Sequence, residues 1–342
     1  MITHCLNKIA ARQNLSREET AGVLEELIAG RMSDSQAAGL LMGLRVKGET
    51  AEEILGLIDT MERHMVKVSL DDSDAIDVCG TGGDGRHTFN VSTAATIVIA
   101  AGGVTVAKHG NRSVSSKCGS ADVLEALGVK IDLTPHQSKM CADATGIGFF
   151  FAPLYHPAMK AVAPIRKNLA VRTVFNMIGP LLNPAGVKRQ LIGAFSVPAA
   201  RLLAEVVQAR SYRKACTVHS FDGFDEISPF APNHVFEVMP QRYAVAEKQF
   251  AFAEKNGSFK PESIRGESAE QNAAIILSVL QGDKGFARKM VLANAAFGFY
   301  VAGKTATVEE GLHLAEELID HGAALRKLEQ FRNFTQEFRE NN

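Results

Sequence analysis

One pattern of polar and apolar positions occurs three times in the first 70 residues. A hydroxyl residue is followed three positions later by a glutamate or glutamine, and then by apolar residues at every third or fourth position. The three starts lie at Ser16 to Glu19, Ser33 to Gln36 and Thr50 to Glu53, and each is typical of a capping box at a helix N-terminus. Gly30 and Gly48 end the first two runs. The pattern predicts three short helices whose apolar faces need a partner surface.

The pattern changes after the acidic turn at residues 71–74. Residues 75–79 form a short apolar run that indicates a buried strand, and they lead directly into a glycine-rich loop. Further apolar runs predict helices at residues 92–101, 120–127 and 199–209 and strands at residues 104–107, 190–196 and 214–219. Strands that alternate with helices are typical of a parallel α/β sheet, and the last third of the chain is again helical. Residues 155–184 fit neither a strand nor one uninterrupted helix.

Composition excludes several classes of protein. Lys and Arg number 37 against 38 Asp and Glu, so the formal net charge is −1 and no overall basic field exists to hold a nucleic acid or an anionic membrane. The longest apolar stretch, residues 94–107, is interrupted by glycines and is shorter than the roughly 20 residues of a membrane-spanning helix. No signal-peptide pattern is apparent. We therefore expect no nucleic-acid or membrane partner.

The cysteines indicate the redox environment. The five are scattered without a C-x-x-C spacing, at Cys5, Cys79, Cys118, Cys141 and Cys216. Such spacing is typical of reduced thiols, so we expect a cytoplasmic protein without thiolate-bound metal.

Two loops rich in glycine and hydroxyl residues follow two of the predicted strands. The first runs from Gly80 to Gly85 and the second from Lys108 to Ser116. Glycines allow backbone N–H groups to converge on an anion, and Lys108 and Arg112 add positive charge. Because ligands of open α/β sheets bind at the carboxyl ends of the strands, we expect the loops at residues 80, 108 and 220 on one rim. The pair of loops predicts a phosphate site.

The first loop also matches the glycine spacing G-x-G-x-x-G of dinucleotide-binding proteins. In those proteins the loop continues directly into a helix, and an acidic residue closes the next strand. Here several residues separate Gly85 from the expected helix cap at Ser92, and the next strand closes with Lys108 and His109. The Gly-Lys-Ser/Thr ending of a Walker A loop is missing as well. The sequence therefore predicts another kind of phosphate loop.

Five groups of motifs carry a resemblance to a known family. They lie at residues 77–84 with 88–93, 108–122, 151–159, 172–176 with 179–184, and 222–226. The resemblance extends over nearly the whole chain, which is similar to the anthranilate phosphoribosyltransferases of tryptophan biosynthesis. This family transfers the phosphoribosyl group of phosphoribosyl pyrophosphate (PRPP) to the amine of anthranilate and releases pyrophosphate. The resemblance implies this reaction, these two substrates, two Mg²⁺ ions and a homodimer formed through the helical domain.

The resemblance also implies residues for each ligand. The PRPP site would contain Gly80, Gly83, Asp84, Thr88, Asn90, Val91, Ser92, Thr93, Lys108, His109, Gly110, Asn111, Arg112, Ser113, Val114, Ser115, Ser116 and Ser120. Arg166 and Asn111 would bind the anthranilate carboxylate, which a guanidinium and an amide suit. The walls of that pocket would be Gly80, His109, Tyr155, His156, Gly179 and Pro180. Magnesium prefers oxygen ligands, and its ligands would be Ser92, Asp225 and Glu226.

Residue chemistry leaves several points open. Neighbouring side chains point in opposite directions in extended structure, so Asp225 and Glu226 can serve one cluster only if the loop bends or two ions bridge them. Arg166 could be a surface helix residue, and Tyr155 and His156 could belong to the core and a turn. No covalent nucleophile is expected, and the residue types do not identify a general base.

Two other functions are compatible with the same fold. A pyrimidine nucleoside phosphorylase would use phosphate instead of a pyrophosphate donor, and a phosphorolysis assay separates it from the transferase. A non-enzymatic relative would bind nucleic acid, which predicts a basic surface and salt-dependent retention of DNA. The loop at residues 111–113 and the Asp225–Glu226 pair favour the transferase.

We therefore predict a two-domain α/β protein with the nucleoside phosphorylase/phosphoribosyltransferase fold. Residues 1–70 and about 155–188 would form a small all-helical domain on the anthranilate side. Residues 71–154 and 189–342 would form a larger α/β domain, with a central, mainly parallel sheet flanked by helices and with the PRPP site. The substrates would meet between the two domains, which we expect to be hinged.

Overall fold

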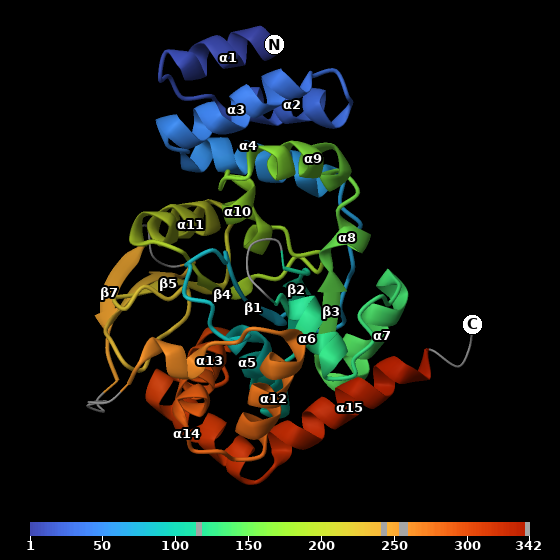
Figure 1. Ribbon diagram of the computed structural model, residues 1–342, viewed down its shortest axis with the longest axis vertical. Coiled ribbons are helices and arrows are strands. Elements are labelled where there is room, and N and C mark those ends of the chain that lie inside the picture. Colours follow the sequence, from blue (N-terminus) through green and yellow to red (C-terminus); the bar gives the residue numbers. More distant parts are fainter. Residues whose placement is uncertain (114–117, 241–244, 253–258, 339–342) are drawn as a thin grey trace.

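The computed structural model describes residues 1–113, 118–240, 245–252 and 259–338. Figure 1 shows a layer of N-terminal helices above a larger body that is built on one sheet. Val114, Ser115 and Ser116, which are predicted to bind PRPP, lie outside the described residues.

The N-terminal layer contains α1 (Ile2–Ala10), α2 (Arg17–Ile28), α3 (Asp34–Lys47) and α4 (Ala51–Arg63). The last three are the predicted helices, and each of their capping boxes is formed in both directions. Their apolar faces meet in one core that includes Leu24, Leu41 and Ile58. The sequence does not predict α1, because its N-cap residue, Met1, has no side chain that can accept a capping hydrogen bond.

The described residues of the larger body form a seven-stranded sheet. Its strands are β1 (Ile76–Gly80), β2 (Val106–Gly110), β3 (Ile147–Phe151), β4 (Arg189–Gly193), β5 (Lys214–Ser220), β6 (Asn233–Val238) and β7 (Ala246–Phe250). The strand order is β3-β2-β1-β4-β5-β6-β7. β1 to β5 pair in parallel, whereas β6 and β7 extend one edge in antiparallel orientation. The predicted, mainly parallel sheet is confirmed, although β4 ends at Gly193 and not at Ser196.

Alternate residues of the central strands face opposite sides of the sheet. Val78 and Leu191 share one core with α5 (Val91–Ala101) and α13 (Phe286–Ala302). Helices α6 (Ser120–Ala126), α7 (Pro135–Thr145), α12 (Ala269–Leu280), α14 (Val308–Asp320) and α15 (Ala323–Glu337) complete this core. Cys79 and Ile192 face the other side, where they join α11 (Val197–Ala209) and the N-terminal helices. The central strands are therefore buried on both faces, as in other parallel sheets.

Short elements connect the sheet to the helical layer. After β3 come α8 (Ala152–Tyr155), α9 (Met159–Leu169), α10 (Phe175–Ile178) and the 3-10 helix η1 (Gly179–Leu181), while a second 3-10 helix, η2 (Pro261–Ile264), precedes α12. α9 packs against α2 and α3. This contact supports the assignment of residues 155–188 to the helical domain, whose boundaries stay a prediction. Within the described ranges, no helix has both the length and the apolar character needed to cross a membrane.

Candidate active site

The first glycine-rich loop follows β1 at the carboxyl edge of the sheet. The Thr81 N–H donates to the Gly193 carbonyl at 2.8 Å, which ties the loop to the end of β4. The Gly82 N–H donates to Asp225 Oδ2 at 2.8 Å, and Asp225 lies in the loop after β5. A Cβ atom on Gly80 would lie 2.9 Å from the same carboxylate oxygen, so glycine leaves room for it. The carboxyl ends of β1, β4 and β5 therefore meet at this rim, as predicted from the parallel topology.

Three carboxylates gather at the rim: those of Asp84, Asp225 and Glu226. The Asp225 N–H donates to Asp84 Oδ2 at 3.3 Å. Burial raises the pKa of Asp225 well above its usual value, and the nearby Asp84 and Glu226 raise it further. Burial also raises the pKa of Glu226 to about 7, although the positive charge of Lys108 acts in the opposite direction. Burial is thus the main cause of both shifts, and a cation bound beside these carboxyls would favour their charged forms.

The chain bends at Asp225 and Glu226. Because this segment is not extended, the two neighbouring carboxylates can face the same rim. Asp225 accepts from the backbone of the glycine loop, while Glu226 accepts from the Ser92 N–H at the start of α5. Among the described residues, no group of three or more His, Cys, Asp or Glu side chains is placed to hold a metal ion by itself. Mg²⁺ keeps waters and substrate phosphates among its ligands, so two carboxylates and a hydroxyl fit such an ion.

The helix after the loop, α5, begins one residue earlier than predicted. Its N-cap is Asn90 and not Ser92, and Asn90 makes no side-chain capping bond to the described backbone. The Asn90 N–H is instead held by Asn272 Oδ1 at 3.0 Å. Ser92 lies in the first turn, where its Oγ accepts a hydrogen bond from Lys108 Nζ at 3.3 Å. The start of α5 therefore faces the same rim as Lys108, in the position where helix N-termini bind phosphate.

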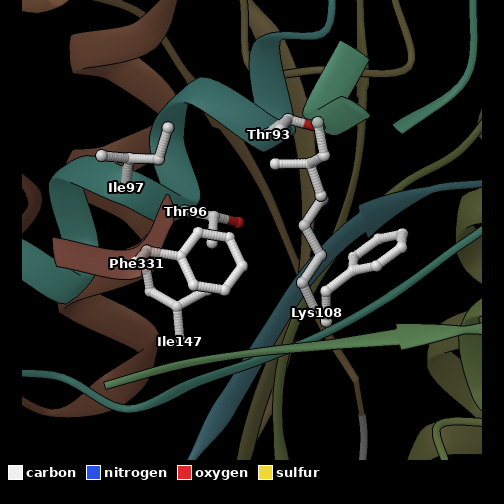
Figure 2. A pocket seen from close by; sticks show the side chains of 8 residues that line it. Thr93, Thr96, Ile97, Lys108, Ile147 and Phe331 are labelled. Carbon is white, nitrogen blue, oxygen red and sulfur yellow. The ribbon is translucent and has the colours of Figure 1, made fainter. Parts of the chain in front are cut away.

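Three predicted PRPP residues around this helix start have other structural roles. Thr88 pairs with Arg265 in an isolated bridge, and the Val91 side chain is fully buried. The Thr93 side chain faces a small cavity of about 10 Å³, which Lys108, Ile97 and Phe331 also line (Figure 2). A space of this size has room for about one water molecule. Val91 and Thr93 can thus contribute only backbone groups to a ligand in this conformation.

Lys108 lies in the middle of β2, so the strand continues to Gly110 and does not end at Ala107 as predicted. Only 3% of its surface is exposed. Its Nζ donates to the Val78 carbonyl at 2.8 Å in addition to Ser92 Oγ. Burial lowers the pKa of Lys108, while neighbouring Asp77 and Glu226 favour the protonated form. Lys108 therefore places a positive charge between the glycine loop and Glu226.

The second loop is anchored to α6 by Asp122. Asp122 Oδ2 accepts from the Gly119 N–H at 2.8 Å and from the Ser113 N–H at 3.1 Å, so one carboxylate holds two points of the loop. The Arg112 guanidinium donates to Glu125 and to Asp122, and these bonds raise the pKa of Arg112 above its usual value. Arg112 therefore does not present the free charge predicted for the phosphate site, because its partners lie on α6.

Gly110 brings the second loop against α6. A Cβ atom at this position would overlap Ser120 Oγ, which donates to the Asn111 carbonyl at 3.4 Å. The Asn111 side chain is exposed, and its Oδ1 accepts from the Arg112 N–H at 2.7 Å. Among the described residues, its amide nitrogen has no hydrogen-bond partner.

Arg166 lies in the last turn of α9, on the helical side of the site. Its guanidinium carbon is 5.7 Å from the centre of the Phe175 ring. Burial lowers the pKa of Arg166, and among the described residues no carboxylate offsets this effect or pairs with the guanidinium. At Gly179, no described atom lies within 4 Å of a Cβ position, whereas Pro180 is buried. A half-buried arginine without a partner fits an anionic ligand better than a surface role.

Two histidines form a pair on the acceptor side. His109 Nε2 and His156 Nε2 lie 3.1 Å apart, so one ring donates a hydrogen bond to the other. Burial lowers the pKa of His109 to about 3, with a further contribution from His156, and burial lowers the pKa of His156 to about 4. Both rings are therefore neutral at pH 7.

Tyr155 does not fit its predicted role as a pocket wall. The side chain is completely buried, and its ring packs edge-on against Phe150 at a centroid distance of 5.5 Å. It belongs to a small core with Val68. The core alternative holds for Tyr155, whereas the adjacent His156 turns toward His109.

Arg172 is a site residue that sequence reasoning missed. Its guanidinium donates to the Gly83 carbonyl in the glycine loop and lies 4.8 Å from the centre of the Phe195 ring. Arg172 comes from the segment between α9 and α10, so it links the helical side to the loop of the α/β domain. Arg172 is the first residue of the family motif at residues 172–176, and this motif is the only feature of the sequence that could have indicated its role.

Comparison with known proteins agrees with this geometry. Residues 72–325 match the glycosyl transferase family, a/b domain, and residues 3–65 match the glycosyl transferase family, helical bundle domain. The fold and the site thus define a two-domain glycosyltransferase. The chain is 43% identical over 342 residues to anthranilate phosphoribosyltransferase of Alkaliphilus metalliredigens, covering 99% of this chain and 100% of the relative. The chain is 44% identical over 340 residues to anthranilate phosphoribosyltransferase of Acetivibrio thermocellus, and this alignment covers 99% of this chain and 98% of the relative. The chain belongs to the anthranilate phosphoribosyltransferase family.

Solved structures of that family share the fold. Anthranilate phosphoribosyltransferase from Thermus thermophilus matches with a TM-score of 0.88 and 38% identity, covering 97% of this chain and 99% of the other. The enzyme from Saccharomyces cerevisiae in complex with PRPP and Mg matches with a TM-score of 0.88 and 26% identity over 98% of both chains. The predicted family is confirmed, and the phosphorylase and nucleic-acid-binding alternatives are not favoured.

Proposed function

We propose that the chain transfers the phosphoribosyl group of PRPP to the amine of anthranilate and releases pyrophosphate, as a step of tryptophan biosynthesis. The observation that carries this proposal is the convergence of the glycine loop, the start of α5, Lys108, Asp225 and Glu226 at one rim. Backbone N–H groups and a lysine bind phosphate, and carboxylates bind the cations that accompany pyrophosphate. The names of the relatives support the same reaction.

The donor lies between the two loops in this proposal. The N–H groups of Thr81, Gly82, Asn90 and Val91 are bonded within the protein, so the first loop offers those of Gly83 and Asp84 and the start of α5 offers that of Thr93. The second loop contacts the donor through residues 108–113 and Ser120. The Lys108 ammonium group has three N–H donors. Two of them donate to the Val78 carbonyl and to Ser92 Oγ. The third is left for a phosphate oxygen. Asp122 keeps the second loop in place for this contact.

We assign Asp225, Glu226 and Ser92 Oγ as the residues that hold two Mg²⁺ ions together with pyrophosphate oxygens. The raised pKa of Asp225, caused by burial and by Asp84 and Glu226, supports this position for a cation. When bound, the ions neutralise the charge that develops on pyrophosphate as it leaves. A relative solved with PRPP and Mg supports the kind of metal.

Anthranilate lies on the helical side, with its carboxylate on Arg166 and the Asn111 amide. The neutral His109–His156 pair forms an uncharged wall beside the aromatic ring. The amine lone pair attacks C1 of the ribose, the C1–O bond breaks, and its electrons leave on pyrophosphate. The nitrogen loses its proton after the new bond forms, so the chain needs no covalent nucleophile.

We also propose a cytoplasmic homodimer that closes over its substrates. All five cysteines are free, which supports a reducing compartment. Val46 on α3 is 71% exposed, which supports an apolar contact through the helical domain. The contact of Arg172 with Gly83 supports a site shared by both domains. Light scattering tests the dimer, and a small-angle scattering profile that PRPP and Mg²⁺ leave unchanged would contradict closure.

The test of the reaction is the loss of anthranilate fluorescence when purified protein is mixed with PRPP and Mg²⁺. We expect turnover by the wild type and a loss of at least roughly 100-fold in Asp225→Asn and Glu226→Gln, because each removes a ligand charge. A magnesium titration of both variants separates weaker metal binding from a slower chemical step. Glu309→Gln, in the exposed first turn of α14, serves as the matched carboxylate control. A folded wild type that leaves anthranilate unchanged would contradict the proposal, and phosphorolysis would be assayed next.

A further inference from the structure

Three buried polar side chains meet behind the rim, where the sheet contacts the segment that returns from the helical domain. They are Asp77 on β1, Asn183 after η1 and Gln190 on β4. Asp77 and Gln190 are fully buried, and 5% of Asn183 is exposed. None of the three was assigned to a substrate by the sequence analysis.

One carboxylate oxygen joins the other two residues. Asp77 Oδ2 accepts from Asn183 Nδ2 at 2.9 Å and from Gln190 Nε2 at 3.1 Å. Asn183 Nδ2 also donates to the Ala107 carbonyl at 2.8 Å, and Gln190 Nε2 also donates to the Pro180 carbonyl at 2.6 Å. Each amide nitrogen therefore bridges Asp77 to a backbone carbonyl on another segment.

The bridged segments carry the two halves of the proposed site. Asp77 precedes Gly80 by three residues on the strand that leads into the glycine loop. Ala107 directly precedes Lys108 and His109 on β2. Pro180 lies beside Gly179 on the anthranilate side. The three side chains thus connect the base of the donor loops to the wall of the acceptor pocket.

Stability alone does not account for a carboxylate at this position. Burial raises the pKa of Asp77, although the positive charge of Lys108 acts in the opposite direction, and among the described residues its Oδ1 has no hydrogen-bond partner. A buried carboxylate with one unsatisfied oxygen costs free energy, and apolar residues of similar volume would fill the same space without that cost. Polar groups at this place are explained if their hydrogen bonds hold the surrounding backbone segments in fixed positions.

We propose that Asp77, Asn183 and Gln190 are positioning residues that fix the acceptor pocket relative to the donor loops. This inference rests on the proposed transfer reaction. The network sets the distance between the attacking amine and C1 of PRPP, and it does so through backbone carbonyls without touching either substrate. Loss of the network should therefore slow the chemical step more than it weakens donor binding.

The test compares kcat with donor affinity in Asn183→Ala and Gln190→Met. Gln190→Met keeps the volume of the side chain and removes all three bonds that Nε2 donates, to Asp77, to the Pro180 carbonyl and to Cys79 Sγ. We expect kcat to fall roughly 10- to 100-fold, because displacements of about 1 Å have effects of this size, while the Kd for PRPP with Mg²⁺, measured by calorimetry, changes less than about threefold.

A charge swap adds an internal rescue. Asn183→Asp alone places two carboxylates together, whereas Asp77→Asn combined with Asn183→Asp restores an amide-to-carboxylate bond. The double variant still leaves the Ala107 carbonyl without its donor and Gln190 Nε2 without the acceptor at residue 77. We expect the double variant to regain part of the kcat lost in Asn183→Asp. Thr335→Val is the matched control, because it removes a buried hydrogen bond to the Lys130 N–H far from the rim.

Several outcomes would overturn the inference. They are an unchanged kcat in folded Gln190→Met, a loss of PRPP affinity as large as the loss of kcat, or an equal loss of kcat in Thr335→Val. A wild type without turnover would instead contradict the proposed reaction. Amide hydrogen exchange would then decide the inference: faster exchange at both 76–80 and 179–185 in Gln190→Met supports the bridge, and unchanged exchange overturns it.

Discussion

A Cβ atom on Gly193 would overlap the carbonyl oxygen of Asp225. Gly193 ends β4, while Asp225 lies in the loop after β5, so this contact sets how closely the predicted metal carboxylate approaches the rim. A side chain at residue 193 can be accommodated only if the backbone at Asp225 moves.

We therefore expect Gly193→Ala to lower activity by roughly 100-fold or more, because a shift of Asp225 displaces the cation site. The free energy of unfolding should also fall, by about 1–3 kcal/mol, from overpacking. Magnesium-dependent turnover and urea unfolding measure the two effects. Gly39→Ala is the control, since its added Cβ would meet only Leu6 Cδ2 at 3.9 Å. Full activity in Gly193→Ala would show that the position of Asp225 is not critical.

Asp122 should control donor affinity through the second loop. Asp122→Ala removes the acceptor for the Ser113 and Gly119 N–H groups, and hydrogen bonds to a charged group contribute about 1.5–3 kcal/mol each. We expect the KM for PRPP to rise by at least roughly tenfold, with a smaller change for anthranilate. Glu125→Gln disturbs the same arginine but neither loop N–H, so its KM values should stay near those of the wild type. Equal effects in both variants would point to Arg112 instead.

Arg166 should determine affinity for anthranilate. Its guanidinium has no carboxylate partner in the described part of the chain, and a charge-assisted bond to the substrate would contribute about 1.5–3 kcal/mol. Arg166→Gln should therefore raise the KM for anthranilate roughly 10- to 150-fold and leave the Kd for PRPP unchanged. Lys167→Gln, on the exposed face of α9, is the neighbouring control. An equal rise for both substrates would contradict this assignment.

His156 should make the protein less stable in acid. Burial lowers the pKa of His156 from 6.5 to about 4 in the folded state, so the unfolded chain binds the proton more tightly. The contribution of His156 to the free energy of unfolding is therefore complete above pH 6.5 and is lost as the pH falls toward 4. The slope of this loss is up to about 1.4 kcal/mol per pH unit.

The measurement is the free energy of unfolding at pH 7 and pH 5 for the wild type and His156→Gln. The variant should lose less stability between the two values, because its side chain does not titrate. Exposed His313→Gln should follow the wild type. Parallel pH profiles for all three proteins would show that His156 does not carry the effect.

Local signals predicted much of this structure. The capping boxes of α2, α3 and α4 involve residues three positions apart, so a short window of sequence contains all the groups involved. The rim could be predicted as well, because parallel strands bring their carboxyl ends together regardless of the distance between them along the chain. β3, β6 and β7 were not predicted from the sequence; of these, β7 is polar and exposed along most of its length, which hides the pattern of a strand.

Side-chain partners were harder to predict than positions. Arg112 could be placed in the second loop, but its pairing with Glu125 depends on the direction in which α6 leaves that loop. Tyr155 and His156 are adjacent, yet only the fold determines which of them enters the core. Asn183 and Asp77 are 106 residues apart, and no local pattern connects an amide with a carboxylate at that separation.

The antiparallel strand β7 closes one side of the sheet with a charged border. Glu247 and Lys248 at its middle are exposed, and Glu247 is held by Arg201 at 2.7 Å. A foreign strand that added to this edge would have to strip water from both charges before forming its first backbone bonds. We therefore expect β7, although it lies away from the rim, to protect the sheet from pairing with other strands.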